Sequence, residues 1–163
     1  MRPFVILAAA AALSLAGCRQ APAQVDQGAA AQAFLAANAK AAGVVTLPSG
    51  LQYRIVRSGP PAGAHPHLQD EVKVNYEGKL IDGKVFDSSY ARGQPAAMPL
   101  QNLIPGWIEA LQLMRPGDEW ILYVPPALGY GAEGNEAIPP GSALIFRIEL
   151  LDFLPGPGSA GQG

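Results

Sequence analysis

From residue 51 onward, apolar and polar residues alternate along the chain with a period of two, which predicts β-strands. The alternation is strictest over 71–78, where Val72, Val74 and Tyr76 share one face, and it is regular again over 143–152. The remaining predicted strands are 51–57, 80–86 and 117–125. The pair Asp82-Gly83 within the second of these is a strong hairpin signal, so the strands are expected to be antiparallel.

Beyond the N-terminal region, only residues 104–114 have helical periodicity. Trp107, Leu111 and Met114 recur at i, i+4 and i+7, and Pro105 suits the first helical position. Pro116-Gly117 should end the helix. The pattern leaves two roles open for Trp107, a buried core anchor or the floor of a pocket.

These elements predict an α+β fold in which an antiparallel sheet of about five strands wraps around one short helix. The folded domain is expected over 47–154, and a Pro- and Gly-rich disordered tail over 155–163. The sequence contains no internal repeat.

The N-terminal region has a different character. Residues 1–17 contain Arg2 and an apolar run too short to span a bilayer, which indicates a cleaved export signal. The signal ends in Leu15-Ala16-Gly17-Cys18, which looks like the lipobox of bacterial lipoproteins and implies lipidation of Cys18. The alternative is ordinary cleavage that leaves a free thiol. Residues 18–46 are then a lipidated linker with an Ala-rich helix over about 27–42, acting either as a stalk or as a helix that packs on a partner.

Composition excludes several functions. The 11 basic and 13 acidic residues are not clustered by sign, which argues against nucleic-acid binding. A single cysteine allows neither an intramolecular disulfide nor a thiolate metal cluster, and His65 and His67 are expected to be solvated residues of the loop 58–67. No phosphate-binding loop or nucleophile elbow occurs, so an enzyme of this sequence is expected to work without covalent chemistry, metal or cofactor.

Six separate blocks resemble, in order and spacing, the FK506-binding-protein-type (FKBP) peptidyl-prolyl isomerases, and the resemblance runs from about residue 47 to 153. The blocks are Val74-Asn75-Tyr76-Glu77-Gly78, Val85-Phe86-Asp87-Ser88-Ser89, Leu103-Ile104-Pro105-Gly106-Trp107, Gly129-Tyr130-Gly131, Ile138-Pro139-Pro140 and Leu144-Ile145-Phe146. Residues 44–53 look more narrowly like the bacterial branch that includes the macrophage infectivity potentiator. Members of that branch often dimerise through an N-terminal helical segment, which here implies at most a weak dimer through 26–42.

The resemblance implies peptidyl-prolyl cis–trans isomerase activity without a cofactor, on proline-containing polypeptides. It makes Trp107 the floor under the prolyl ring and surrounds that ring with apolar walls. It assigns polar contacts with the substrate carbonyls to Asp87, Tyr130 and the Ile104 backbone N–H. The implied catalytic residues are Tyr76, Phe86, Asp87, Ile104, Trp107, Tyr130 and Phe146, and the implied substrate-binding residues are Leu103, Met98, Ile138 and Arg92. Asp87 is also expected to hydrogen-bond the Tyr76 phenol and so to orient it.

FK506-type macrolides are implied as inhibitors. Two departures from the family lie at the pocket rim: Ala96 stands where many members have a large aromatic residue, and the loop before Ile138 is one residue shorter than in the human prototype and more acidic. We therefore expect weaker macrolide binding than in that prototype.

Export and lipidation place the expected enzyme on the periplasmic side of a bacterial cell envelope, acting on exported polypeptides. Arg19 is not the Asp that usually retains lipoproteins at the inner membrane, which favours the outer membrane. The alternative is a non-catalytic chaperone or host-interaction module that uses the same pocket. An inert structural lipoprotein would leave the concentration of aromatic residues unexplained.

Overall fold

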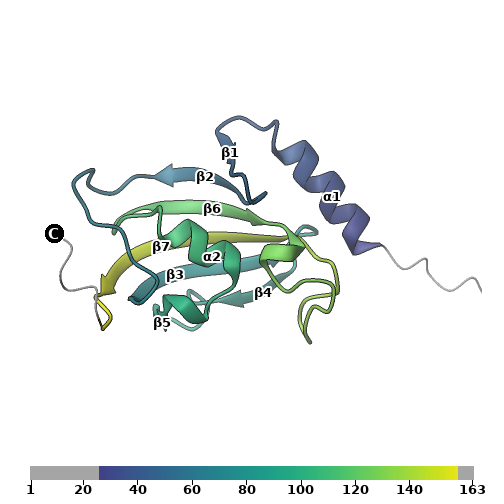
Figure 1. The fold of residues 1–163 in the computed structure, drawn as a ribbon. Coiled ribbons are helices and arrows are strands. Elements are labelled where there is room, and N and C mark those ends of the chain that lie inside the picture. Colours follow the sequence, from purple (N-terminus) through teal and green to yellow (C-terminus); the bar gives the residue numbers. More distant parts are fainter. Residues whose placement is uncertain (1–25, 158–163) are drawn as a thin grey trace, which may run out of the picture.

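The computed structural model describes residues 26–157 (Figure 1). The predicted export signal over 1–17, the predicted lipidation site Cys18 and the part of the predicted tail from 158 to 163 lie outside the described residues. Residues 155–157 were predicted to belong to the disordered tail, but this is wrong, because the Gly156 N–H donates to Asp70 at 2.9 Å and holds the segment to the domain. Within the described part, no helix is long and apolar enough to cross a membrane.

One antiparallel sheet forms the body of the domain, with strand order β1-β2-β6-β7-β3-β4 and with β5 paired to β3. Its strands are β1 (Val44–Thr46), β2 (Gln52–Arg57), β3 (Glu71–Leu80), β4 (Val85–Ser88), β5 (Ala96–Pro99), β6 (Glu119–Val124) and β7 (Leu144–Leu154). The sheet therefore has seven strands where about five were predicted. The two additional strands, β1 and β5, have three and four residues, too few for an alternation to be recognised. Strand β1 also precedes residue 47, the expected start of the domain.

The two longest strands, β3 and β7, pair over ten positions at the centre of the sheet. Their alternate residues are buried, as the period of two predicted: Val72, Val74 and Tyr76 on β3, and Leu144, Phe146, Ile148 and Leu150 on β7. These side chains form the core together with the inward residues of β6, namely Trp120, Leu122 and Val124.

Helix α2 (Pro105–Leu111) lies across this apolar face of the sheet (Figure 1). Pro105 occupies the first turn, and the helix buries Trp107, Ala110 and Leu111. It ends three residues earlier than the predicted 114, but Met114 is nevertheless fully buried. The expectation of a single short helix wrapped by the sheet is confirmed for this part of the chain.

Helix α1 (Gln27–Asn38) begins at Asp26, whose carboxylate accepts hydrogen bonds from the backbone N–H groups of Gly28 and Ala29. The helix is neither a free stalk nor held only by a partner, because it packs on the sheet of its own chain. Ala31 is buried, and the Phe34 ring lies 6.0 Å from the Tyr123 ring. The Gln52 amide donates to the Leu35 carbonyl and accepts from Asn38, at 2.9 and 2.8 Å.

The loop before β3 is held more firmly than a solvated loop would be. His65 is half-buried, with Nδ1 3.0 Å from the Met114 carbonyl oxygen, so the expectation that it is simply solvated is wrong. Asp118 adds a second anchor by accepting hydrogen bonds from the backbone N–H groups of Gly59 and Arg115. His67 is exposed, as expected.

Candidate functional site

A cavity of about 510 Å³ opens between the helix α2 and the curved sheet. Its wall comes from β3, β4, β5, the short 3₁₀ helix η1 (Leu100–Asn102), α2, β7 and the loop between β6 and β7. The lining residues are Tyr76, Phe86, Asp87, Met98, Asn102, Leu103, Ile104, Trp107, Tyr130, Asn135, Ala137, Ile138 and Phe146.

The base of the cavity is a cluster of aromatic rings packed edge to face. Trp107, only 4% exposed, has ring centroids 5.1 Å from Tyr76 and 5.2 Å from Phe146, at interplanar angles of 84° and 86°. Phe146 in turn meets Phe86 at 5.6 Å and 88°. Such T-shaped contacts are favourable beyond their area of burial and hold each ring in one orientation. The floor is therefore apolar and preorganised.

Gly78 makes the contact between Phe86 and Phe146 possible. It lies on β3 directly beneath these rings, and a Cβ atom at this position would come within 2.7 Å of both of them. The absence of a side chain at residue 78 thus determines how closely the two walls approach.

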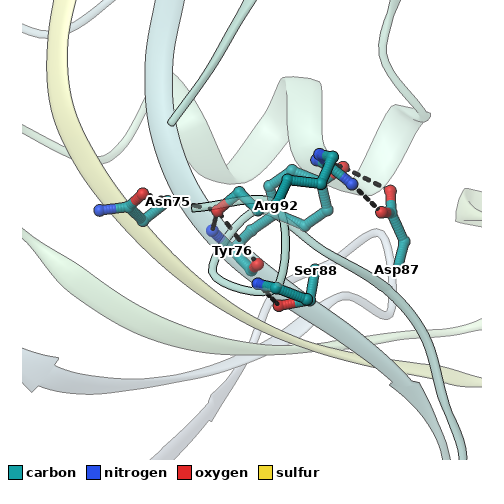
Figure 2. A network of polar contacts seen from close by, with 7 residues as sticks. Asn75, Tyr76, Asp87, Ser88 and Arg92 are labelled. Atoms are coloured by element: carbon teal, nitrogen blue, oxygen red, sulfur yellow. Dashed lines mark hydrogen bonds and ion pairs between the residues drawn. The ribbon is translucent and has the colours of Figure 1, made fainter. Parts of the chain in front are cut away.

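One polar cluster stands at the edge of this apolar surface (Figure 2). The Tyr76 hydroxyl donates a hydrogen bond to Asp87, and Arg92 forms an ion pair with the same carboxylate. Arg92 Nη2 also donates to the Tyr76 hydroxyl oxygen at 2.9 Å, and its guanidinium carbon lies 5.4 Å from the centroid of the Tyr76 ring. The three side chains are thus mutually hydrogen-bonded, and the predicted contact between Asp87 and the Tyr76 phenol is present.

The electrostatics of the cluster keep Asp87 ionised. Burial alone would raise the pKa of Asp87, but the hydrogen bonds from Tyr76 and Arg92 outweigh it, and the pKa lies below the ordinary value. Burial, reinforced by the neighbouring carboxylate, raises the pKa of the Tyr76 phenol. At neutral pH the cluster therefore contains a carboxylate, a neutral phenol and a guanidinium.

Backbone contacts fix Tyr76 from behind. Ser89 is fully buried, and its hydroxyl accepts a hydrogen bond from the Tyr76 N–H at 2.8 Å. The Ser89 N–H donates to the Tyr76 carbonyl at 2.9 Å. This pair of contacts joins the end of β4 to β3 and so holds residues 85–89 against residues 74–78.

The mouth of the cavity carries hydrogen-bond donors. Ile104 precedes the first turn of α2 in an extended conformation, and its N–H donates to no other described residue. Tyr130 lies across the mouth in the loop that follows β6; its side chain is 40% exposed. Both groups remain available to a ligand.

The structure brings the residues singled out from the sequence to this one cavity. All seven predicted catalytic residues line it, as do Leu103, Met98 and Ile138. Arg92 does not line the cavity but contacts two residues that do, Asp87 and Tyr76.

Sequence reasoning missed three lining residues, Asn102, Asn135 and Ala137. Asn102 immediately precedes the predicted Leu103. The other two lie between the predicted Tyr130 and Ile138. The resemblance had already placed the loop of Asn135 and Ala137 at the pocket rim, but their own residue types are ordinary for loops and did not mark them individually.

Comparison with known proteins agrees with this geometry. A family model described as FKBP-type peptidyl-prolyl cis-trans isomerase matches residues 63–151, and a model for the domain amino-terminal to such isomerases matches residues 9–55.

Individual relatives are similar over most of this chain. The peptidyl-prolyl cis-trans isomerase Mip of Coxiella burnetii is 54% identical over 121 residues, which are 74% of this chain and 52% of that protein. The outer membrane protein MIP of Legionella longbeachae is 49% identical over 120 residues, 73% of this chain and 51% of the relative. The chain thus spans about half the length of these curated relatives.

Among solved structures, FkpA from Escherichia coli superimposes with a TM-score of 0.77 at 45% identity, covering 81% of this chain and 61% of FkpA. The matched family model extends over more than half of the chain and includes every residue that lines the cavity. The chain therefore belongs to the FKBP-type peptidyl-prolyl cis-trans isomerase family.

Proposed function

We propose that this protein accelerates cis–trans rotation about X–Pro bonds in exported polypeptides and so assists their folding. The observation that carries the proposal is the aromatic cavity with Trp107 at its base, in a chain of this family. A cavity of about 510 Å³ with mostly apolar walls and a few polar groups has the size and character of a small-ligand site. A prolyl ring and its two flanking peptide groups would fit such a site.

The chemistry needs no nucleophile. Rotation about an amide is slow because resonance imposes a barrier of about 20 kcal/mol. In the twisted transition state that resonance is lost, and the charge separation across the amide decreases. A dry apolar surface favours the twisted form over the planar, better hydrated one, so binding is stronger in the transition state than in the ground state.

Each part of the cavity has a distinct role in this proposal. Trp107 supports the prolyl ring, and the side chains of Tyr76, Phe86, Leu103, Ile104 and Phe146 enclose it. Met98 and Ile138 contact residues next to the proline. The Ile104 N–H and the Tyr130 hydroxyl donate hydrogen bonds to substrate carbonyl groups.

Asp87 acts indirectly, and not through the contact with a substrate carbonyl that the resemblance implied. Its lowered pKa keeps it an ionised carboxylate, which accepts hydrogen bonds but cannot donate one to a carbonyl. We therefore assign it the role of orienting Tyr76 and Arg92. Replacing Asp87 with Ala should lower both the isomerisation rate and inhibitor affinity, and the assignment would be wrong if both stayed at their wild-type values.

A protease-coupled assay on a Leu-Pro peptide tests the function as a whole. The proposal predicts acceleration of the slow, cis-limited phase in proportion to protein concentration. A non-catalytic chaperone or host-interaction module using the same cavity would bind the peptide without accelerating that phase.

Macrolide binding depends on the rim. Ala96 is a small residue on β5 beside the cavity-lining Met98, and the short loop 133–137 contributes Asn135 and Ala137 to the lining. Both reduce the apolar surface available to a large ligand. FK506 should bind more weakly than it does to the human prototype, and an equal or lower dissociation constant measured by calorimetry would contradict this.

The proposed location is the cell envelope, with lipid attached to Cys18 and the enzyme facing the periplasm, at the outer membrane rather than the inner. Support comes from the lipobox-like sequence and from the Legionella relative, which is named an outer membrane protein. Membrane fractionation of the wild type and of Cys18→Ser tests the proposal. The variant should move to the soluble fraction or remain an unprocessed precursor.

A weak dimer through residues 26–42 would have to use the outer side of α1. Ala31 and Phe34 already contact the chain's own sheet, so the surface left for a second copy consists of exposed alanines together with Gln32 and Lys40. Light scattering on the soluble form, over a range of concentrations, tests for this dimer.

A further inference from the structure

The loop between β6 and β7 has a defined shape where it borders the cavity. At its base the Gly141 N–H donates to the Gly131 carbonyl at 3.0 Å, and further out the Gly134 N–H donates to the Tyr130 carbonyl at 3.0 Å. Gly134 has a φ of +65°, and a Cβ atom there would lie 2.2 Å from the Ile138 carbonyl oxygen. The chain therefore turns back on itself tightly between Tyr130 and Ile138, two residues of the cavity wall.

Asn135 occupies the tip of this turn with a fixed side-chain orientation. Its Oδ1 atom accepts hydrogen bonds from the backbone N–H groups of both Ala137 and Ile138, each at 2.9 Å. Only the oxygen of the amide can accept such bonds, so the position of Nδ2 follows from the network. Nδ2 donates to no other residue between 26 and 157, although Asn135 lines the mouth of the cavity.

A substrate bound in this cavity can use a donor in addition to the Ile104 N–H and the Tyr130 hydroxyl, because an extended peptide brings more than two carbonyl groups to the mouth. The prolyl ring enters the apolar base, and the peptide groups on either side of it stay at the mouth, partly removed from water. A peptide carbonyl that loses its water without gaining a donor weakens binding. In the polar cluster at the edge, the Tyr76 hydroxyl already donates to Asp87, and Arg92 does not line the cavity.

We propose that the Asn135 side-chain amide is a substrate-binding group, whose Nδ2 donates a hydrogen bond to a main-chain carbonyl of a residue flanking the proline. The inference rests on the proposed isomerase function and adds a specificity element to it. A donor to the main chain strengthens binding with little dependence on the neighbouring side chain. The loop 131–138 thereby contributes to affinity for the extended peptide rather than to rotation about the prolyl bond itself.

Replacing Asn135 with Asp separates the two functions of the amide. Aspartate keeps the acceptor that holds the turn but lacks the donor, whereas Asn135→Ala removes both. We expect N135D to raise KM about five- to tenfold for a Leu-Pro peptide, with kcat and melting temperature close to wild type. We expect N135A to raise KM at least as much.

N135D also adds a negative charge to the loop, and a second substitution at the exposed neighbour Glu136 provides the control for that charge. The double variant N135D/E136Q restores the wild-type loop charge and should keep the raised KM, whereas Glu136→Gln alone should behave as wild type. A wild-type KM for N135D/E136Q would overturn the proposal, because Asn135 would then matter only for the turn. Absence of acceleration by the wild-type protein would instead overturn the proposed function, so the two failures are distinguishable.

A second measurement uses the substrate. Replacing the peptide bond next to the X-Pro unit with an ester, on either side in separate peptides, weakens the carbonyl as an acceptor. NMR exchange measurements of cis–trans rotation do not require cleavage and apply to both peptides. For one of the two esters, the loss of affinity relative to the parent peptide should be larger with the wild type than with N135D/E136Q. If each ester weakened binding to the two proteins equally, the proposal would be overturned.

Discussion

At the scale of single residues, Trp107 is both a core residue and the base of the cavity. It is 4% exposed and belongs to the central apolar cluster, and its ring also lines the cavity. The sequence pattern left these two roles as alternatives, and the structure shows that they are compatible. The indole packs edge to face with Tyr76 and Phe146, which fixes the ring while it still lines the cavity.

The substitution Trp107→Leu should therefore damage catalysis more than stability. Leucine keeps the core apolar but lacks the flat surface of the indole. The substitution breaks no hydrogen bond within the described residues, because the indole N–H of Trp107 has no partner there. We expect kcat/KM in the protease-coupled assay to fall about tenfold or more, with a loss of about 2 kcal/mol in unfolding free energy.

Trp120 provides a matched control for this substitution. It is 5% exposed, its indole N–H also lacks a partner within residues 26–157, and it stacks on Tyr53 at 4.3 Å, but it does not line the cavity. Trp120→Leu should cost similar stability and leave the activity of the folded fraction unchanged. A Trp107→Leu protein that fails to fold would show that this residue is mainly a core anchor.

Gly78 controls the aromatic walls from below. The substitution Gly78→Ala places a methyl group against the rings of Phe86 and Phe146, which must separate. Overpacking of this kind costs about 1–3 kcal/mol and should also lower kcat/KM. Urea unfolding and the isomerase assay measure the two effects, and a second change, Phe86→Leu, should recover part of the lost stability. An alanine variant as stable and active as wild type would show that the rings adjust freely.

At the scale of elements, the predictability of each strand depends on its length and environment. Strands β3 and β6, and β7 as far as Leu150, bury one face, so their inward residues are mostly apolar at every second position and could be predicted from the sequence. Strand β5 is only Ala-Ala-Met-Pro and gives no such pattern. Its place in the sheet depends on pairing with β3, which is a tertiary contact.

The cavity walls and the rim also differ in predictability. Residues of the walls stand on β3, β4, α2 and β7, within blocks that resemble the family. The contacts of Arg92 and Asn135 arise from how two loops fold, and nothing in their own residue types marks them. Sequence reasoning could name Arg92 through the resemblance but could not show that it lies outside the cavity and pairs with Asp87.

Helix α1 docks on the sheet through a narrow stripe of one side. Ala31, Phe34, Leu35 and Asn38 follow the spacing i, i+3, i+4 and i+7, and Ala31 is the one fully buried member. The N-terminal end of α1 also lies close to the base of the loop between β6 and β7 (residues 125–143, the rim loop). A Cβ atom added at Gly141 would be 3.3 Å from the Gly28 nitrogen. No residue of α1 lines the cavity, so docking and catalysis should be separable.

Ala31→Glu tests this separation. The glutamate cannot remain in the contact without burying a charge, so α1 should leave the sheet at a cost of about 1–3 kcal/mol. We expect faster hydrogen exchange in α1 and a lower melting temperature, with kcat/KM close to wild type. The control is Ala33→Glu, the same substitution at an exposed position of the same helix, which should change neither quantity. Loss of activity in Ala31→Glu alone would mean that α1 supports the cavity through the rim loop.

At the scale of the whole molecule, the two faces of the sheet serve different purposes. One face holds the core and the cavity. On the other, Glu149 accepts hydrogen bonds from Arg57 at 2.5 Å and Asn75 at 3.3 Å, which links β7 to β2 and β3. Glu119 on β6 pairs with Arg147 at 2.5 Å and with Arg57 at 3.6 Å. These contacts connect four neighbouring strands on the side away from the ligand.

This polar face should make stability depend on pH without affecting the cavity. The hydrogen bond from Arg57, assisted by Asn75, lowers the pKa of Glu149 below its ordinary value, against the opposing effect of burial. Glu149 therefore binds a proton more readily in the unfolded chain than in the folded one. Its contribution to stability is complete above the unfolded pKa, near 4.5, and is lost as the pH falls through the lower folded pKa.

The substitution Arg57→Gln should remove much of this dependence. In urea unfolding between pH 7 and 3, the variant should be less stable than wild type at pH 7, and the difference should shrink as Glu149 is protonated in both proteins. Asp87 also has a lowered pKa, but its contribution is common to both proteins and cancels in the comparison. Arg54→Gln is the matched control, since Arg54 is exposed on the same strand and forms no ion pair with another described residue. A difference between Arg57→Gln and wild type that stays constant down to pH 3 would show that Arg57 stabilises the sheet through packing of its aliphatic chain rather than through Glu149.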